Sequence, residues 1–211
     1  MKLIIAEKPS LARNIIAGLG EKMDKKDGYF IGENYIVSWA FGHLFSLADI
    51  ETYTGSESAR WTLDNLPCFP KEFKFELRRA DNKKGVDSGV KKQFNILSTL
   101  CNRADVDTII NAGDADREGE IIVRLCVMNA LKGEKRQMRL WLPDQTPETV
   151  AKAITEMKDE GEYDIFHNTS VFTKIAFFLI TSSSYTRHIK AKAFGYKLFI
   201  QTQTDYQSIT K

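Results

Sequence analysis

Short aliphatic runs alternate with helical segments along most of this chain, and this alternation constrains the fold more than any other feature. The first run, Lys2–Ala6, has the length and composition of a buried strand, and Leu11–Leu19 follows it with apolar residues at helical spacing before Gly20. Asp107–Ala112 and Glu118–Leu131 repeat the order of strand and then helix. Alternation on this scale predicts an α/β fold with a largely parallel sheet flanked by helices.

The remaining segments add a hairpin, an irregular stretch and further strands and helices. Residues 42–73 contain Gly55, Pro67 and Pro70 and have no regular pattern, so we expect a long surface excursion there. The other predicted elements are a hairpin of Gly28–Gly32 with Tyr35–Phe41, a strand at Phe73–Arg78, a helix at Val86–Arg103, a strand at Met138–Leu142 and a helix from Thr146 to about Lys158.

Composition is that of a soluble globular protein and excludes several classes. Hydrophobic residues make up 43% of the 211, and the net charge of +2 does not by itself indicate a nucleic-acid binder. The three cysteines are scattered and form no CxxC pair, so neither a zinc knuckle nor a disulfide framework is indicated, and a reducing, cytoplasmic setting fits best. The apolar run Ile175–Ile180 is far shorter than the roughly 20 residues of a membrane helix, so no membrane partner is expected.

Three carboxylates stand at alternate positions directly after the strand predicted at Asp107–Ala112. They are Asp114, Asp116 and Glu118. In an extended turn, residues two apart point the same way, so these side chains can converge on one cation, and Mg²⁺ is a hard ion that needs few carboxylates. An EF-hand loop is excluded because its twelfth position is Leu125 rather than glutamate. An acidic helix N-terminus, favoured by the helix dipole, remains the alternative.

Glu7 follows the first predicted strand in the same way as Asp114 follows its own strand. In open α/β sheets, ligands bind beyond the carboxyl ends of the strands. We therefore expect the two strands to be neighbours and Glu7 to lie within reach of the acidic residues.

Four motifs, in this order, resemble those of type IA DNA topoisomerases and in particular their topoisomerase III branch. They are AEKPS at 6–10, WAFGHL at 39–44, GDADREGE at 113–120, and RLWL at 139–142 followed by TPE at 146–148. GDADREGE is similar to the GxDxDREGE signature of the TOPRIM domain in these enzymes. The resemblance covers about residues 1–165 and implies a TOPRIM (Rossmann-like) domain, with residues 166–211 as a short C-terminal appendage.

The resemblance also implies a reaction, the transesterification by which a type IA topoisomerase (an isomerase) cuts and reseals one DNA strand through a tyrosine. In that scheme Glu7 is a general acid near the 3′-oxygen leaving group, and Lys8 offers positive charge to the scissile phosphate. Asp114, Asp116 and Glu118, with Glu7 adjacent, hold Mg²⁺. The implied partner is a single-stranded DNA segment.

Two other motif residues have open roles. Arg117 stands between the predicted metal ligands, so it either contacts a DNA phosphate or pairs with the neighbouring carboxylates. His43 follows a glycine, and a lone histidine in such a position is more often structural than catalytic; the resemblance implies a place in the wall near the active site.

Residues 166–211 differ from the rest of the chain in charge and composition. From residue 169 onward, Asp205 is the one acidic residue among six basic ones. The family's continuation is not recognisable, and Tyr185, Tyr196 and Tyr206 lie in no context that matches its nucleophile. We therefore expect a divergent basic, aromatic-rich tail and a chain truncated before the catalytic tyrosine; a small native C-terminal module is the alternative.

Three functions are compatible with the sequence. The four motifs favour the N-terminal TOPRIM part of a type IA topoisomerase, inactive alone, whose missing domains another chain could supply. A TOPRIM nuclease or primase-like enzyme would share the acidic residues but lack the AEKPS and RLWL–TPE motifs. A non-catalytic DNA-binding module would keep the fold without turnover.

Overall fold

The structure of the protein is a computed structural model that describes residues 1–48, 50–55, 74–80 and 85–163. Two compact units can be distinguished. The first comprises Met1–Ser46 and Phe75–Val171, and the second comprises Leu47–Lys74 and Phe172–Lys211. Few residues of the second unit are described, chiefly the short helix α2 (Ile50–Thr54). The boundary expected at residue 165 lies outside the described residues, and all four motifs belong to the first unit.

A seven-stranded sheet forms the centre of the first unit, with the strand order β2-β3-β4-β1-β7-β8-β9. Its strands are β1 (Lys2–Ala6), β2 (Asp24–Lys26), β3 (Tyr29–Ile31), β4 (Tyr35–Trp39), β7 (Thr108–Ala112), β8 (Arg136–Arg139) and β9 (Lys158–Asp159). The four central strands are parallel, whereas β2, β3 and β9 run antiparallel to their neighbours. The predicted α/β fold with a largely parallel central sheet is confirmed. A separate two-stranded sheet pairs β5 (Phe45–Leu47) with β6 (Phe75–Leu77).

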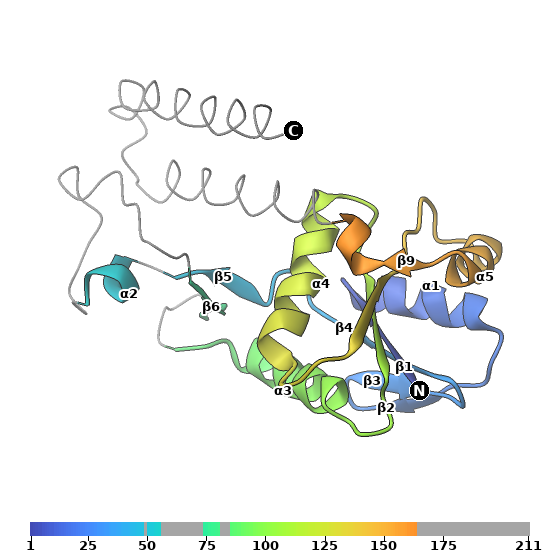
Figure 1. Cartoon of the computed structure of the whole chain (residues 1–211). Coiled ribbons are helices and arrows are strands. Elements are labelled where there is room, and N and C mark those ends of the chain that lie inside the picture. Colours follow the sequence, from blue (N-terminus) through green and yellow to red (C-terminus); the bar gives the residue numbers. More distant parts are fainter. Residues whose placement is uncertain (49, 56–73, 81–84, 164–211) are drawn as a thin grey trace, which may run out of the picture. The chain divides into compact units, whose positions relative to one another are not determined.

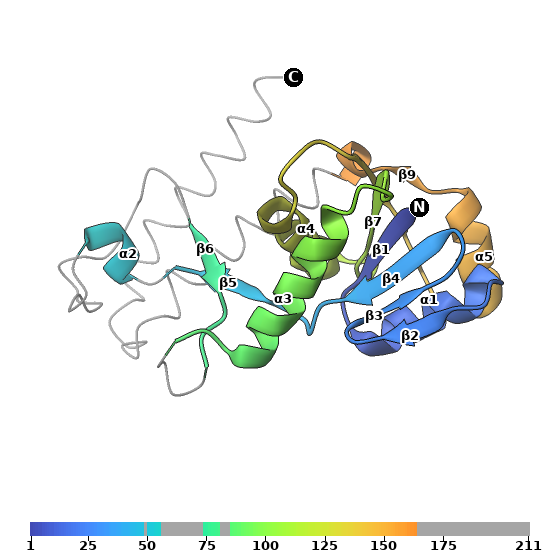
Figure 2. The same ribbon diagram turned by 90° about the horizontal axis from the view of Figure 1, so that it is seen from below.

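Helices cover both faces of the central sheet (Figures 1 and 2). One face carries α1 (Pro9–Leu19) and α5 (Pro147–Thr155), and the other carries α3 (Ser88–Cys101) and α4 (Arg117–Ala130). A 3₁₀ helix, η1 (Glu160–Tyr163), follows β9. The central strands are therefore apolar on both sides. In β1, Leu3 and Ile5 pack into the core under α3 and α4, whereas Ile4 and Ala6 pack into the core under α1 and α5.

Capping residues fix most helix ends where the sequence indicates them. Gly20 closes α1 in the left-handed conformation at φ 70°, a backbone region that glycine adopts without steric cost. Asp87 accepts hydrogen bonds from the N–H groups of Gly89 and Val90, so α3 begins two residues later than the apolar pattern predicted. Thr146 caps α5 through the N–H of Thr149.

Two predicted element ends are wrong by three residues each. The strand predicted at Met138–Leu142 is β8, which ends at Arg139. Leu140 and Leu142 are buried because they pack with the core under α1 and α5, and not because they lie in a strand. The helix predicted to reach Lys158 ends at Thr155, since Lys158 already belongs to β9.

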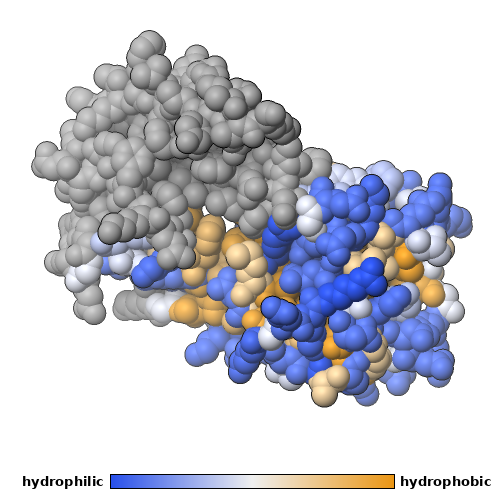
Figure 3. Space-filling model, viewed as in Figure 1, coloured by the Kyte–Doolittle hydropathy of each residue, from blue (hydrophilic) through white to orange (hydrophobic). Residues whose placement is uncertain are grey.

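On the face shown in Figure 3, the described surface is mostly hydrophilic, with hydrophobic residues exposed between the hydrophilic ones. Across the described residues, no helix has both the length and the apolar character that crossing a membrane requires.

A candidate metal and phosphate site

Parallel pairing of β1 with β7 brings two segments of the predicted site together. The strands are in register up to Ala6 opposite Ala112, so both end at the same edge of the sheet. Glu7 and the acidic turn then follow at that edge, and the backbone N–H of Asp114 donates to Oε2 of Glu7 at 3.2 Å. The prediction that these strands are neighbours, with Glu7 within reach of Asp114, is confirmed.

Lys8 forms an ion pair with the first acidic residue of the turn. Its Nζ lies 2.5 Å from Oδ2 of Asp114. The other carboxylate oxygen of Asp114, Oδ1, is buried and accepts no hydrogen bond from the residues that the structure describes. The hydrogen bond to Asp114 raises the pKa of the Lys8 ammonium. Burial lowers this pKa, whereas the negative charges of Asp114, Glu7 and Asp116 raise it further. Lys8 is therefore a permanent cation among three carboxylates.

Burial raises the pKa of the Glu7 carboxyl above its ordinary value. The hydrogen bond from the Asp114 N–H opposes this shift, the charge of Asp114 adds to it, and Lys8 and Asp116 contribute in opposite directions. A raised pKa increases the protonated fraction of Glu7 near neutral pH, which is the form that can donate a proton to a leaving group.

Asp116 is used as the N-cap of α4. Its backbone is extended, and Oδ1 accepts a hydrogen bond of 2.7 Å from the N–H of Gly119. Glu118 and Glu120 occupy the first turn of the helix, where the dipole favours negative charge. The acidic motif is thus also the acidic helix start that the sequence left as the alternative.

Glu118 lies within α4, where the backbone is helical rather than extended. Its side chain therefore does not point the same way as those of Asp114 and Asp116, as the extended turn predicted from the sequence would require. Its Oε2 is 3.2 Å from Nε2 of His43. The segment before His43 is tied to the end of β1, because the N–H of Gly42 donates to the carbonyl oxygen of Glu7 at 3.0 Å. His43 therefore belongs to the wall of this site, as the resemblance implied.

The acidic side chains do not converge on a single point. Within residues 1–48, 50–55, 74–80 and 85–163, no three His, Cys, Asp or Glu side chains form a group that could hold a metal ion. Asp114 contacts Lys8, Asp116 caps α4 and Glu118 contacts His43. Their assignment to Mg²⁺, with Glu7, stays a prediction. Arg117 is the first residue of α4, and the role of its side chain also stays a prediction.

Two glycines let the acidic turn lie directly on the first turn of α4. A Cβ on Gly113 would be 2.0 Å from the carbonyl oxygen of Gly119, and a Cβ on Gly119 would be 2.4 Å from the backbone nitrogen of Asp114. Real Cβ atoms do not approach backbone atoms so closely. The two glycines of the GDADREGE motif are therefore required by close approach of the backbone.

A buried arginine, Arg139, donates hydrogen bonds to the backbone of the same turn. This role was not predicted from the sequence. Arg139 has no exposed surface, and its guanidinium donates to the carbonyl oxygens of Gly113 at 3.0 Å and Asp114 at 2.8 Å. It also donates to Oε2 of the buried Glu120 at 2.7 Å. One sequence feature could have indicated a buried ion pair: Glu120 and Arg139 are charged, and each stands next to an apolar stretch.

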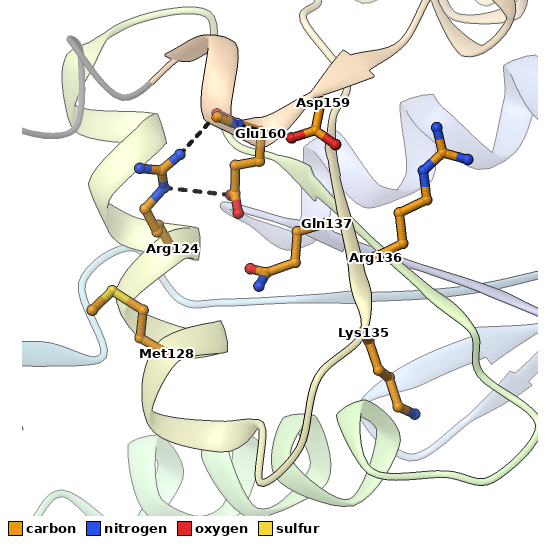
Figure 4. A pocket seen from close by; sticks show the side chains of 8 residues that line it. Arg124, Met128, Lys135, Arg136, Gln137, Asp159 and Glu160 are labelled. Atoms are coloured by element: carbon orange, nitrogen blue, oxygen red, sulfur yellow. Dashed lines mark hydrogen bonds and ion pairs between the residues drawn. The ribbon is translucent and has the colours of Figure 1, made fainter.

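A cavity of about 560 Å³ lies beside this buried network, between α4 and the β8–β9 edge (Figure 4). Arg124 and Glu160 meet on its wall, where the guanidinium donates to the Glu160 carbonyl oxygen at 2.9 Å and lies 3.5 Å from its carboxylate. Neither Glu7 nor Asp114 lines the cavity. The cavity is therefore distinct from the candidate site.

The comparison with protein families agrees with this geometry. The Toprim domain family matches residues 2–142, which include β1, β7, α4 and the acidic turn. The chain belongs to the Toprim domain family.

This Toprim chain is similar to proteins described as DNA topoisomerase 3. It is 37% identical over 170 residues to that of Bacillus cereus (strain ATCC 14579) and 36% identical over 170 residues to that of Bacillus subtilis (strain 168); each match covers 80% of this chain and 22% of the relative. The protein of Shouchella clausii (strain KSM-K16) is 34% identical over 166 residues, which are 79% of this chain and 21% of the relative. The chain thus spans about a fifth of the length of these relatives.

Proposed function

We propose that this chain is the Toprim part of a type IA DNA topoisomerase, which binds Mg²⁺ and the scissile phosphate during cleavage and religation of a single DNA strand. The observation that carries the proposal is the meeting of Glu7, Lys8 and Asp114 at the carboxyl edge of β1 and β7. An acid, a cation and a carboxylate in contact with one another are groups that assist phosphoryl transfer, alongside the nucleophile that the reaction also needs. The similarity to DNA topoisomerase 3 proteins supports the same reaction.

Each residue has a role that follows from its surroundings. Glu7, with its raised pKa, would donate the proton that the 3′-oxygen takes as it leaves. Lys8 and Arg117 would contact the DNA phosphate, where Lys8 offers a charge that stays positive at any physiological pH. Among the described residues, none donates a hydrogen bond to one oxygen of the partially exposed Asp114, which fits a hard cation.

Mg²⁺ would be held by Asp114, Asp116 and Glu118 with Glu7 adjacent. The oxygen-only donor set fits this ion, and the bound ion would supply positive charge that orders the phosphate. Because the three acids make separate contacts in the described structure, some rearrangement of side chains must accompany binding, and the affinity should be modest.

The first prediction concerns stabilisation by Mg²⁺. Titration with MgCl₂ should raise the thermal unfolding temperature of the wild-type chain, because a ligand that binds only the folded state stabilises it. The double variant Asp114→Asn, Asp116→Asn should lose this response. A suitable control is Asp24→Asn, Glu33→Gln, which removes the same charge at exposed positions far from the motif in sequence and should respond like wild type. Equal responses of all three proteins would refute the proposed ligands.

The second prediction is that this chain alone neither relaxes nor cleaves DNA. Transesterification needs a positioned nucleophile as well as charge stabilisation, and positioning supplies a large part of the rate. The proposed site offers an acid, a cation and metal ligands. Tyr185, Tyr196 and Tyr206 lie in no sequence context that matches the family's nucleophile.

Incubation with supercoiled plasmid and with labelled single-stranded DNA in Mg²⁺, followed by denaturation, tests this expectation. Unchanged supercoils and free DNA are the expected result. A covalent protein–DNA adduct that disappears in a Tyr185→Phe, Tyr196→Phe or Tyr206→Phe variant would contradict it. Cleaved DNA without an adduct would instead indicate a Toprim nuclease.

A further inference from the structure

The positive charge closest to the acidic turn comes from the chain itself. Lys8 Nζ contacts Oδ2 of Asp114 at 2.5 Å, and the charges of Glu7 and Asp116 also act on this ammonium. One of the four predicted metal ligands, Asp114, is therefore already in contact with a cation. Another, Glu118, faces His43.

The position of Lys8 follows from the fold rather than from a flexible surface contact. Lys8 is the N-cap residue of α1, with an extended backbone, and its side chain makes no capping hydrogen bond. The carbonyl oxygen of Lys8 accepts from the N–H of Ala12, and the carbonyl oxygen of Glu7 accepts from the N–H of Gly42. The backbone is thus held on both sides, and the Lys8 side chain spans the gap from β1 to the turn after β7.

An ammonium bonded to Asp114 Oδ2 and a metal ion bonded to the same carboxylate exclude one another in part. Two cations at one carboxylate repel, and the ammonium occupies lone pairs of Oδ2, so that of the two carboxylate oxygens only Oδ1 is left to the ion while Lys8 stays in place.

We propose that Lys8 competes with Mg²⁺ for Asp114, so that the ammonium acts as an internal substitute for the metal and is released towards the DNA phosphate when the ion binds. The inference rests on the proposed metal site and concerns its regulation. Reciprocity follows: whatever draws Lys8 away from Asp114, a DNA phosphate included, strengthens binding of the metal ion.

Isothermal titration of MgCl₂ into the full chain at fixed ionic strength tests the competition. Lys8→Gln should bind Mg²⁺ about three- to tenfold more tightly than wild type, the range expected when a partly exposed ion pair of about 0.6–1.4 kcal/mol no longer has to be broken. Lys2→Gln is the matched control: it removes the same charge from an exposed lysine at the other end of β1 and should stay within about twofold of wild type. Lys8→Arg keeps the charge and should bind no more tightly than wild type.

The possible outcomes separate this inference from the proposed function. If wild type binds Mg²⁺ and Lys8→Gln binds it no more tightly than Lys2→Gln, the competition is refuted while the metal site stands. If no variant and no wild-type protein binds the ion, the metal site and the competition both fail. Cooperative thermal unfolding of each variant, measured in parallel, shows that affinities of folded proteins are compared.

Discussion

Arg139→Leu should lower the free energy of unfolding by about 3–5 kcal/mol, the range found when one partner of a buried ion pair is removed. Arg139 and Glu120 both have no exposed surface, and Nε of Arg139 lies 2.7 Å from Oε2 of Glu120. Burial raises the pKa of the Glu120 carboxyl, and Arg139 is the strongest influence that opposes this shift. Without Arg139 the carboxylate loses its main counter-charge, and the carbonyl oxygens of Gly113 and Asp114 lose a donor.

Thermal unfolding measures this effect, at about 2–4 °C per kcal/mol for a chain of this size. Arg136→Leu is the matched control, because it makes the same substitution at an exposed position of the same strand, β8. It should change stability by no more than about 0.5 kcal/mol. Adding Glu120→Leu to Arg139→Leu should recover part of the loss, since the buried charge then disappears as well. If Arg139→Leu unfolds at the same temperature as Arg136→Leu, the buried ion pair does not stabilise the fold as proposed.

Apolar patterning was sufficient to predict the centre of the fold. β1 was predicted with its observed bounds, and β7 and α4 to within a residue, because each is a run of aliphatic residues whose period matches its burial. Their order then implied the neighbouring pair of strands, and with it the contact between Glu7 and Asp114. This part of the site follows from the rule that parallel strands end at a common edge.

The sheet edges could not be predicted in the same way. β2 is Asp24-Lys25-Lys26 and β9 is Lys158-Asp159, so both consist only of charged residues and carry no alternation of apolar and polar side chains. Edge strands of this kind are held by backbone pairing, and exposed charges suit them because they discourage pairing with other chains.

Side-chain partners were also beyond the sequence. The contact of His43 with Glu118 joins residues that are 75 positions apart in the sequence. It depends on the distance in space between the start of α4 and the loop that follows β4. Similarly, Arg139 was grouped with an apolar strand, although its guanidinium is the central donor beneath the acidic turn. A charged residue inside a buried segment signals a partner, but it does not name that partner.

The close approach of Gly113 to the backbone of Gly119 leads to the second prediction of a large effect on stability. Gly113→Ala should destabilise the protein by about 1–3 kcal/mol or more, the usual cost of inserting a methyl group into a filled space. All three atoms nearest to the new Cβ belong to the backbone of Gly119, at 2.0, 2.5 and 3.0 Å, so no side chain can move aside. The turn itself must shift, and we therefore expect the variant to lose its stabilisation by Mg²⁺ as well.

Two further variants make this test decisive. Gly133→Ala is the control, because a Cβ there meets no atom within 4 Å, and it should leave stability unchanged or raise it by up to about 1 kcal/mol through the unfolded state. Gly119→Ala approaches the same contact from the other side, where its Cβ would lie 2.4 Å from the Asp114 nitrogen. Alanine favours a helix over glycine by about 1 kcal/mol, so helix propensity alone would make Gly119→Ala more stable than wild type. Destabilisation of both Gly113→Ala and Gly119→Ala, measured by thermal unfolding with and without MgCl₂, would show that close backbone approach outweighs propensity. If Gly119→Ala is instead as stable as Gly133→Ala, the turn has room to move and the close contact does not shape the site.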